Sequence, residues 1–192
     1  MSTRERIVEA AFELFEEQGF ETTTVDEVVE RAGVEREDFF RHFRAKEDAV
    51  LPAHAEMLRV LEDRLALDDP LADRVTQAAR TVLDHFLAEG DRARARHRLA
   101  GHVPLIRARE TDVERSYRRA FFAAITADLG DHAAAELEAE LVASAVVTGH
   151  NVVLKRWLRG VTDSPVAEFE HAMARATAPL RGEAQAYARQ AQ

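Results

Sequence analysis

The segment from Glu35 to Lys46 combines cationic side chains, of types that can bind nucleic acids, with acidic side chains. Its cations are, in order, Arg36, Arg41, His42, Arg44 and Lys46. Arginine, lysine and histidine bind DNA phosphates, and arginine also reads the edges of bases. Acids are interleaved with these cations, because Glu35, Glu37 and Asp38 supply three carboxylates in four residues. A carboxylate near phosphate is repelled, and in the major groove only the amino group of cytosine rewards it.

Other patterns in the sequence do not form a catalytic or metal site. There is no G-x-S-x-G elbow, no glycine-rich phosphate loop and no H-E-x-x-H motif. His85 with Glu89, and His132 with Glu136, have the i, i+4 spacing of two metal ligands, but nothing marks a third ligand. The chain has no cysteine, which excludes disulfides and thiolate chemistry. The sequence therefore predicts no enzyme, no cofactor and no metal.

The segment Thr22–Asp48 must position these cations, and it predicts two short helices and a tight turn. Thr24 and Glu27 have the spacing of a capping box, which starts the first of these helices. Gly33 ends that helix, because glycine adopts the positive φ of a helix C-terminus. The next helix carries Phe39, Phe40 and Phe43. Two short helices joined by a glycine turn are the helix-turn-helix motif, whose second helix lies in the major groove of DNA.

The rest of the 192-residue chain predicts further helices and no strand. The composition, 46% apolar and 32% charged, is that of a globular protein. We expect a first helix ending at Gly19, a fourth from Lys46 to about Leu67, a fifth from Pro70 to Gly90, a basic segment from Arg92 to Arg98, a seventh ending at Leu129, an eighth over about 132–159 and a ninth after Pro165. The predicted fold is all-α, with a three-helix DNA-binding domain at 1–48 and a helical bundle for effector binding and dimerisation at 49–192.

The eighth expected helix is apolar on two sides, and such a helix must be buried on both. One row is Leu137, Leu141, Ala145, Thr148 and Val152; the other is Val142, Val146, Val153 and Trp157. The ninth helix repeats its apolar residues at the three- and four-residue spacing of packed helices. We expect a partner chain here, with an interface made by Val142, Val146, Val153, Trp157, Phe169 and Met173.

The first 48 residues resemble the DNA-binding domain of the TetR family of bacterial repressors. The matching features are Ile7, Ala10-Ala11, Leu14-Phe15, Gly19-Phe20, Thr23-Thr24-Val25, Ala32-Gly33-Val34, Phe39-Phe40-Arg41-His42-Phe43 and Lys46-Glu47. The resemblance implies a homodimeric repressor that binds a palindromic double-stranded DNA operator and dimerises through a four-helix bundle of its last two main helices. It assigns DNA contacts to Thr23, Thr24, Glu35, Arg36, Glu37, Phe40, Arg41, His42 and Lys46.

The resemblance also implies a pocket for a small-molecule effector among the fifth to eighth helices. Lining candidates are Phe86, Leu99, His102, Leu105, Tyr117, Phe121, His150 and Asn151. For any one of these a plain core role is the alternative, although His150 and Asn151 interrupt a long apolar helix and need polar partners. The sequence from Arg98 through Pro104 to Arg109 is similar to a TetR branch with acyl-CoA-like effectors.

The charge of the chain leaves two functions open. The net charge is −9, and residues 1–48 contribute −7 of it, from seven Lys and Arg and fourteen Asp and Glu. Family members commonly have serine where Glu35 stands and threonine where Asp38 stands. We expect DNA binding to be retained, with Glu37 or Asp38 reading cytosine. The alternative is a TetR-fold module for ligand or protein binding that has lost specific DNA binding.

The location we expect is the cytoplasm, with no membrane association. The N-terminus enters an amphipathic helix directly and has no signal-peptide hydrophobic core. No apolar run approaches the roughly 20 residues of a membrane-spanning helix.

Overall fold

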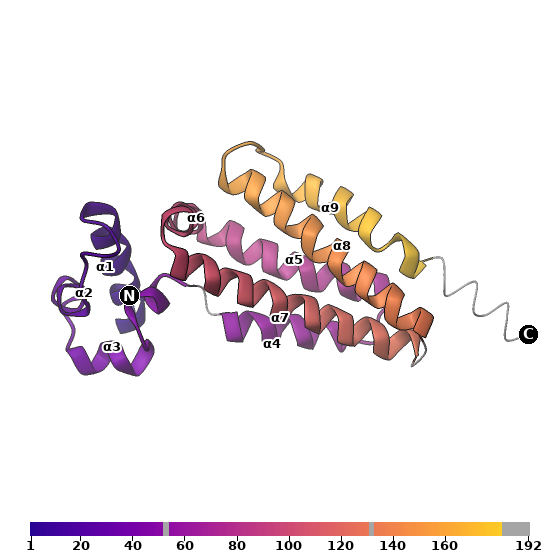
Figure 1. Ribbon diagram of the computed structural model, residues 1–192, viewed down its shortest axis with the longest axis horizontal. Coiled ribbons are helices and arrows are strands. Elements are labelled where there is room, and N and C mark those ends of the chain that lie inside the picture. The colour runs from indigo at the N-terminus through magenta and orange to yellow at the C-terminus, as the bar shows by residue number, and fades with distance from the viewer. Residues whose placement is uncertain (52–53, 131–132, 182–192) are drawn as a thin grey trace, which may run out of the picture. The chain divides into compact units, whose positions relative to one another are not determined.

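The computed structural model describes residues 1–51, 54–130 and 133–181, and their regular structure is helical throughout, as predicted (Figure 1). In chain order the elements are α1 (Thr3–Glu17), α2 (Val25–Ala32), α3 (Arg36–His42), the 3-10 helix η1 (Lys46–Ala49), α4 (His54–Leu65), α5 (Leu71–Glu89), α6 (Asp91–His102), α7 (Pro104–Leu129), α8 (Ala133–Leu158) and α9 (Pro165–Ala176). They form two compact units. The N-terminal unit is Met1–His54 with Asp91–Glu110, and the C-terminal unit is Ala55–Gly90 with Thr111–Gln192.

The helices of the N-terminal unit begin and end where their caps predict. Ser2 accepts a hydrogen bond from the Glu5 amide at 3.2 Å, and Thr24 accepts one from the Glu27 amide at the same distance. In both caps the glutamate side chain accepts from the capping residue's own amide, which completes a capping box. Gly33 follows α2 with φ of 62°, a conformation that favours glycine. The turn into α3 is therefore built from local sequence signals.

The basic helix α6 belongs to the N-terminal unit, although it lies more than 40 residues beyond the expected boundary at residue 48. Its apolar side contributes to the same core as α1, through Ala95 and Ala100, and Val103 and Ile106 extend that contact. The segment Asp91–Glu110 carries six arginines against two acids. It thus brings positive charge to the strongly acidic N-terminal residues.

Three arginines of α6 make different contacts with the rest of the N-terminal unit. Arg92 forms an ion pair with Glu9 at 3.3 Å, and Arg98 forms one with Glu16 at 2.8 Å. Arg96, between them in sequence, is only 2% exposed, and its Nη1 lies 3.5 Å from the carbonyl oxygen of Val50. A fully buried arginine stabilises through its packed stem as well as its charge.

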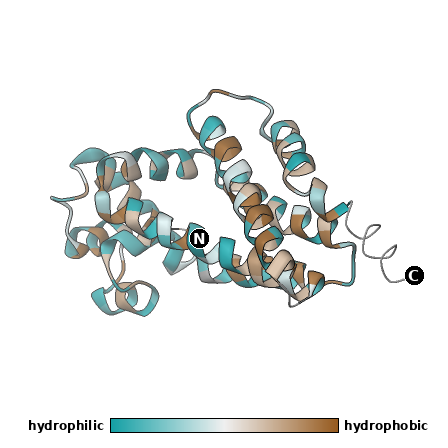
Figure 2. Cartoon of the chain, turned by 45° about the vertical axis from the view of Figure 1, so that its right-hand side comes forward, coloured by the Kyte–Doolittle hydropathy of each residue, from teal (hydrophilic) through white to brown (hydrophobic). Residues whose placement is uncertain are grey.

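The C-terminal unit is a bundle in which α8 packs closely against α9. Gly149 of α8 has no side chain where α9 approaches, and a Cβ there would lie 3.2 Å from Cε of Met173. Figure 2 shows apolar residues along the length of α8. By length and composition α8 could span a membrane, contrary to our expectation from the sequence. Core helices of globular proteins pass the same test, and one inner side of α8 is buried in this unit.

The structure corrects two details of the sequence prediction. The helix expected from Lys46 is a 3-10 turn, η1, and α4 starts at His54. The basic segment 92–98 is part of a helix, and α7 starts at Pro104 because proline is accommodated at a first helical position. The six residues expected at a dimer interface, Val142, Val146, Val153, Trp157, Phe169 and Met173, are already buried within the single chain, and their part in a dimer stays a prediction. Exposed apolar side chains of α8 belong instead to the opposite row.

Replacing Arg96 should destabilise the N-terminal unit. We expect Arg96→Ala to lower the free energy of unfolding by about 3 kcal/mol, because it removes a large buried side chain and leaves a cavity. Arg92→Ala is the matched control: it deletes an exposed ion pair and should cost less than about 1 kcal/mol. Urea unfolding followed by circular dichroism measures both, and equal midpoints for the two variants would contradict the buried role of Arg96.

Candidate DNA-binding surface and ligand pocket

Helix α3 has one buried side and one exposed side. Phe39 and Phe43 are buried in the core, and their rings lie 5.5 Å apart between centroids. The exposed side, here called the α3 face, consists of Glu35, Arg36, Glu37, Phe40, Arg41 and His42. Phe40 is 48% exposed, which is unusual for a large aromatic side chain. All six residues of the α3 face were predicted DNA contacts, and the structure presents them to solvent.

The charges of the α3 face are largely paired within the protein. Arg36 forms an ion pair with Asp26 of α2, and its guanidinium lies 5.2 Å from the ring centroid of Phe40. Arg41 forms an ion pair with Asp38 at 2.7 Å. These exposed pairs are weak, so phosphate groups can replace the carboxylates at little cost.

The acids of the recognition helix have separate roles. Asp38 accepts a long hydrogen bond, 3.4 Å, from the backbone amide of Glu35 and also binds Arg41, so it serves the N-terminus of α3. Acids at that end of a helix also favour its dipole. Glu37 is exposed, and no described residue forms an ion pair with it. Glu37 is therefore the acid of α3 that is best placed to meet a base.

Three further predicted DNA contacts serve the turn before α2. Thr23 is buried, and its hydroxyl donates to the carbonyl of Gly19 at 2.8 Å. Thr24 is exposed and caps α2. The Lys46 ammonium donates to the carbonyl of Thr23 at 2.8 Å and lies 4.3 Å from the ring centroid of Phe20. In this conformation Thr23 and Lys46 stabilise the turn, and only Thr24 of the three presents its side chain to solvent.

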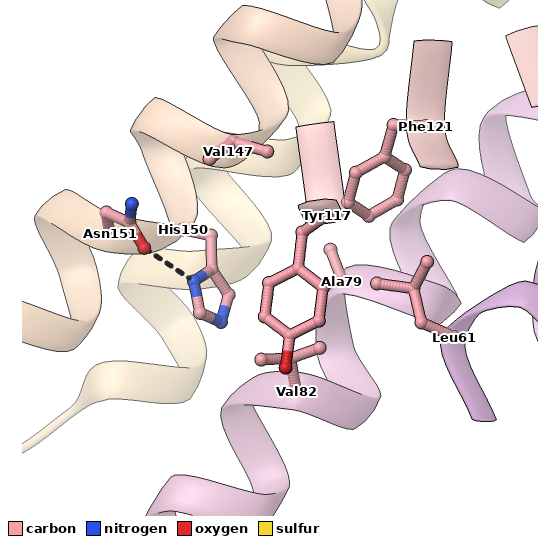
Figure 3. A pocket seen from close by; sticks show the side chains of 8 residues that line it. All are labelled: Leu61, Ala79, Val82, Tyr117, Phe121, Val147, His150 and Asn151. Atoms are coloured by element: carbon pink, nitrogen blue, oxygen red, sulfur yellow. Dashed lines mark hydrogen bonds between the residues drawn. The ribbon is translucent and has the colours of Figure 1, made fainter. Parts of the chain in front are cut away.

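A pocket lies within the C-terminal unit, bounded by α4, α5, α7 and α8 (Figure 3). Its lining residues are Leu61, Ala79, Val82, Tyr117, Phe121, Val147, His150 and Asn151. The free volume is about 20 Å³, which is room for a single water molecule. The lining is mainly apolar, and the polar groups come from α7 and α8.

His150 is held neutral in this pocket. The side chain is 7% exposed, and burial lowers the pKa of His150 to about 4. Its Nδ1 lies 3.3 Å from the Asn151 side-chain oxygen, so Nδ1 carries the proton and donates. Nε2 is then left as an acceptor, buried and without a hydrogen-bond partner among the described residues.

Tyr117 supplies a second unpartnered polar atom. Its hydroxyl is buried and has no hydrogen-bond partner in the described part of the chain. Burial raises the pKa of Tyr117 above its usual value, so the phenol keeps its proton. In Figure 3 the Tyr117 ring and the His150 imidazole both project into the space between α5, α7 and α8. Buried polar groups without partners are rare in folded proteins and point to a ligand or a bound water.

The pocket unites only part of the predicted ligand set. Tyr117, Phe121, His150 and Asn151 line it, whereas Leu99, His102 and Leu105 belong to the N-terminal unit and Phe86 is not among the lining residues. Four further lining residues were not predicted from the sequence: Leu61, Ala79, Val82 and Val147. These positions lie on ordinary apolar helix stripes, and spacing alone cannot separate a pocket wall from a core.

The histidine–glutamate pairs form no metal cluster in the described residues. His85 Nε2 lies 3.7 Å from Glu89 Oε1. Within residues 1–51, 54–130 and 133–181, no third histidine or acid joins this pair to form a metal-binding group. His132 lies outside the described residues.

Comparison with known proteins agrees with the N-terminal motif. Residues 7–51 match the sequence profile described as bacterial regulatory proteins, tetR family. HTH-type transcriptional regulator TcmR from Streptomyces glaucescens is 41% identical over 85 residues, which span 42% of this chain and 37% of TcmR. The chain therefore matches less than two fifths of that relative's length.

Solved structures share the fold over most of the chain. SmeT, the repressor of the multidrug efflux pump SmeDEF of Stenotrophomonas maltophilia, aligns with a TM-score of 0.60 at 20% identity, covering 93% of this chain and 90% of SmeT. FadR from Thermus thermophilus aligns with a TM-score of 0.55 at 20% identity, covering 92% of each chain.

Residues 7–51 thus match the tetR family of bacterial regulatory proteins, and the chain as a whole shares the all-α fold of the SmeT and FadR structures.

The neutral state of His150 predicts a pH-dependent stability. The folded pKa lies below that of an unfolded histidine, so the unfolded chain binds the proton first, and stability falls as pH decreases from about 6.5 towards 4. We expect wild type to lose up to about 3 kcal/mol more than His150→Gln across this window, measured by urea unfolding. His171→Gln, at an exposed position of α9, should keep the wild-type slope. A wild-type slope in His150→Gln would show that His150 is not buried in its neutral form.

Proposed function

We propose that this protein is a cytoplasmic, ligand-responsive repressor that binds a palindromic DNA operator as a homodimer. The observation that carries the proposal is the solvent-exposed α3 face within a matched TetR helix-turn-helix. The wider comparisons support the same class, since SmeT is described as a repressor. Repression, binding to a palindromic operator and dimerisation are all part of this proposal.

The α3 face has the chemistry to read a DNA site. Arg36 and Arg41 supply guanidinium groups for phosphate or guanine, and the exposed ring of Phe40 suits the methyl group of thymine. Glu37 accepts a hydrogen bond from the amino group of cytosine, the one base group in the major groove that suits a carboxylate. The proposed operator therefore contains G·C pairs opposite the middle of α3.

The alternative, a TetR-fold module that no longer reads DNA, is motivated by the acidity of residues 1–48. Ion pairs in the structure weaken this argument from acidity. Glu9 and Glu16 form ion pairs with arginines of α6, which lie outside residues 1–48. Part of the negative charge is thus neutralised from elsewhere in the N-terminal unit, and charge count alone does not argue against DNA binding.

A second copy of the chain is the partner proposed for the outer row of α8. Leu137, Leu141 and Val152 are 63%, 58% and 53% exposed, and Ala145 and Thr148 lie between them in the same row. Helix α9 exposes the small residues Ala167 and Ala174 beside His171. An exposed apolar row on one helix and small residues on the next allow two copies to pack closely around a two-fold axis.

The pocket of the C-terminal unit is proposed as the effector site. One SmeT structure is a complex with triclosan, and the FadR structure is a complex with lauroyl-CoA. An acyl-CoA-like molecule is a further candidate effector. It is supported by the FadR structure and by the similarity of the Arg98–Arg109 segment to a TetR branch with acyl-CoA-like effectors. In either case the effector shifts the population of DNA-binding conformations.

DNA binding is tested with the protein's own upstream intergenic DNA, by fluorescence anisotropy across salt concentrations. We expect a specific complex whose log affinity falls linearly with log salt, because bound cations release counterions. Arg36→Ala should weaken binding about tenfold and reduce the salt slope by about one. Arg115→Ala, an equal charge change on an exposed arginine of α7, is the control and should bind as wild type.

The role of Glu37 is tested on the same DNA. Glu37→Gln should lower the preference for the specific site while non-specific affinity stays equal or rises, because a repulsive charge is removed. If the folded wild-type protein binds no DNA at low salt, and Glu37→Gln gains binding, the module without DNA binding becomes the better description.

The dimer is tested by light scattering after size-exclusion chromatography. Leu141→Glu should convert the dimer into a monomer at micromolar concentration, because it buries a charge in an apolar interface. Val161→Glu changes an equally exposed apolar residue outside the row and should leave the dimer intact. A dimer that survives Leu141→Glu would place the interface elsewhere.

A further inference from the structure

We propose that the pocket binds a neutral, largely apolar molecule through one hydroxyl group, which accepts a hydrogen bond from Tyr117 and donates one to His150. The inference rests on the proposed ligand-responsive function and names the chemical class of its effector. It derives from two residues that line the same small cavity and that each carry a buried polar atom without a partner among the described residues, the Tyr117 hydroxyl and His150 Nε2.

The wall of the pocket selects an uncharged ligand. Leu61, Ala79, Val82, Phe121 and Val147 supply apolar surface, and the remaining described lining residues, Tyr117, His150 and Asn151, are neutral. A carboxylate or phosphate placed here would lose its hydration without gaining a cation among the described lining residues, and burial of an unpaired charge is costly. Apolar surface, by contrast, gains free energy when it leaves water for this site.

The hydrogen-bonding pattern selects a hydroxyl among neutral polar groups. The Tyr117 O–H can rotate and donate, whereas Nε2 of His150 can only accept, because Nδ1 holds the proton opposite Asn151. A ligand hydroxyl both accepts and donates, so it satisfies the two atoms together. An ether or carbonyl oxygen can accept from Tyr117 but leaves Nε2 unpaired, which costs affinity.

The size of the cavity indicates how such a ligand enters. The present free volume of about 20 Å³ matches one water-sized group, and the ligand hydroxyl takes that place. The apolar body of the ligand then displaces side chains of the wall, among which Leu61 comes from α4. Helix α4 directly follows the N-terminal residues in the chain, so displacement at Leu61 acts on the segment that leads to the DNA-binding motif.

Three matched probes test this inference on the full-length protein without DNA, by isothermal titration calorimetry at neutral pH. The probes are 2-naphthol, 2-methoxynaphthalene and 2-naphthoate, which share one ring system and differ in the polar group. We expect 2-naphthol to bind, the methyl ether to bind about tenfold more weakly, and the carboxylate to show no measurable binding.

Variants assign the discrimination to the two residues. Tyr117→Phe should weaken 2-naphthol about fivefold, because one hydrogen bond is lost. His150→Phe should remove the preference for 2-naphthol over the ether, because the acceptor is gone. Thr126→Val is the matched control: it deletes another buried, unpartnered hydroxyl of α7 that does not line the pocket, and binding should not change.

The inference is overturned if none of the probes binds, if 2-naphthoate binds as tightly as 2-naphthol, or if the preference over the ether persists in His150→Phe. Because no DNA is present, the result is independent of operator binding. A protein that binds 2-naphthol but no DNA would retain this inference and lose the proposed function. A protein that binds DNA but none of the probes would do the reverse.

Discussion

The packing of the basic helix α6 against α1 places positive charge beside the acidic residues 1–48. The pairs Arg92–Glu9 and Arg98–Glu16 are exposed, so each contributes little stability. Their main consequence is electrostatic, since they neutralise carboxylates that would otherwise repel DNA. Stability comes from the buried side of α6, where Arg96 and its apolar neighbours complete the core of the N-terminal unit. In the proposed function, the arginines of the α3 face then exchange their partners Asp26 and Asp38 for phosphate.

Helix α8 contributes side chains to three different environments: the core of the C-terminal unit, the pocket and the exposed outer row. One row of side chains is buried in the unit's core, including Val146 and Val153. His150 and Asn151 face the pocket. The outer row, with Leu141 and Val152, is exposed and proposed for the second copy. The proposed ligand site and the proposed dimer interface both use side chains of α8. A shift of this helix would therefore move residues at both sites.

The sequence predicts local features well because they depend on neighbouring residues. The capping box of Thr24 and the glycine turn at Gly33 both follow from spacing within one or two turns. Non-local features escape such reasoning. That α6 joins the N-terminal unit depends on contacts more than 80 residues apart, such as Arg92 with Glu9. The two apolar rows of α8 were recognised, but periodicity does not tell which row the chain itself buries.

The pocket shows the same limit at the scale of single residues. His150 and Asn151 stood out because they interrupt an apolar helix, and the structure gives them a shared cavity with Tyr117. Val82 and Leu61 fit a core role equally well, and only their position in space makes them pocket walls.

The proposal that this acidic chain with a TetR-like motif reads DNA is tested by nuclease footprinting of its own upstream intergenic DNA at low salt. We expect a protected inverted repeat with half-sites about one helical turn apart. A folded, ligand-free dimer that protects no DNA would contradict it.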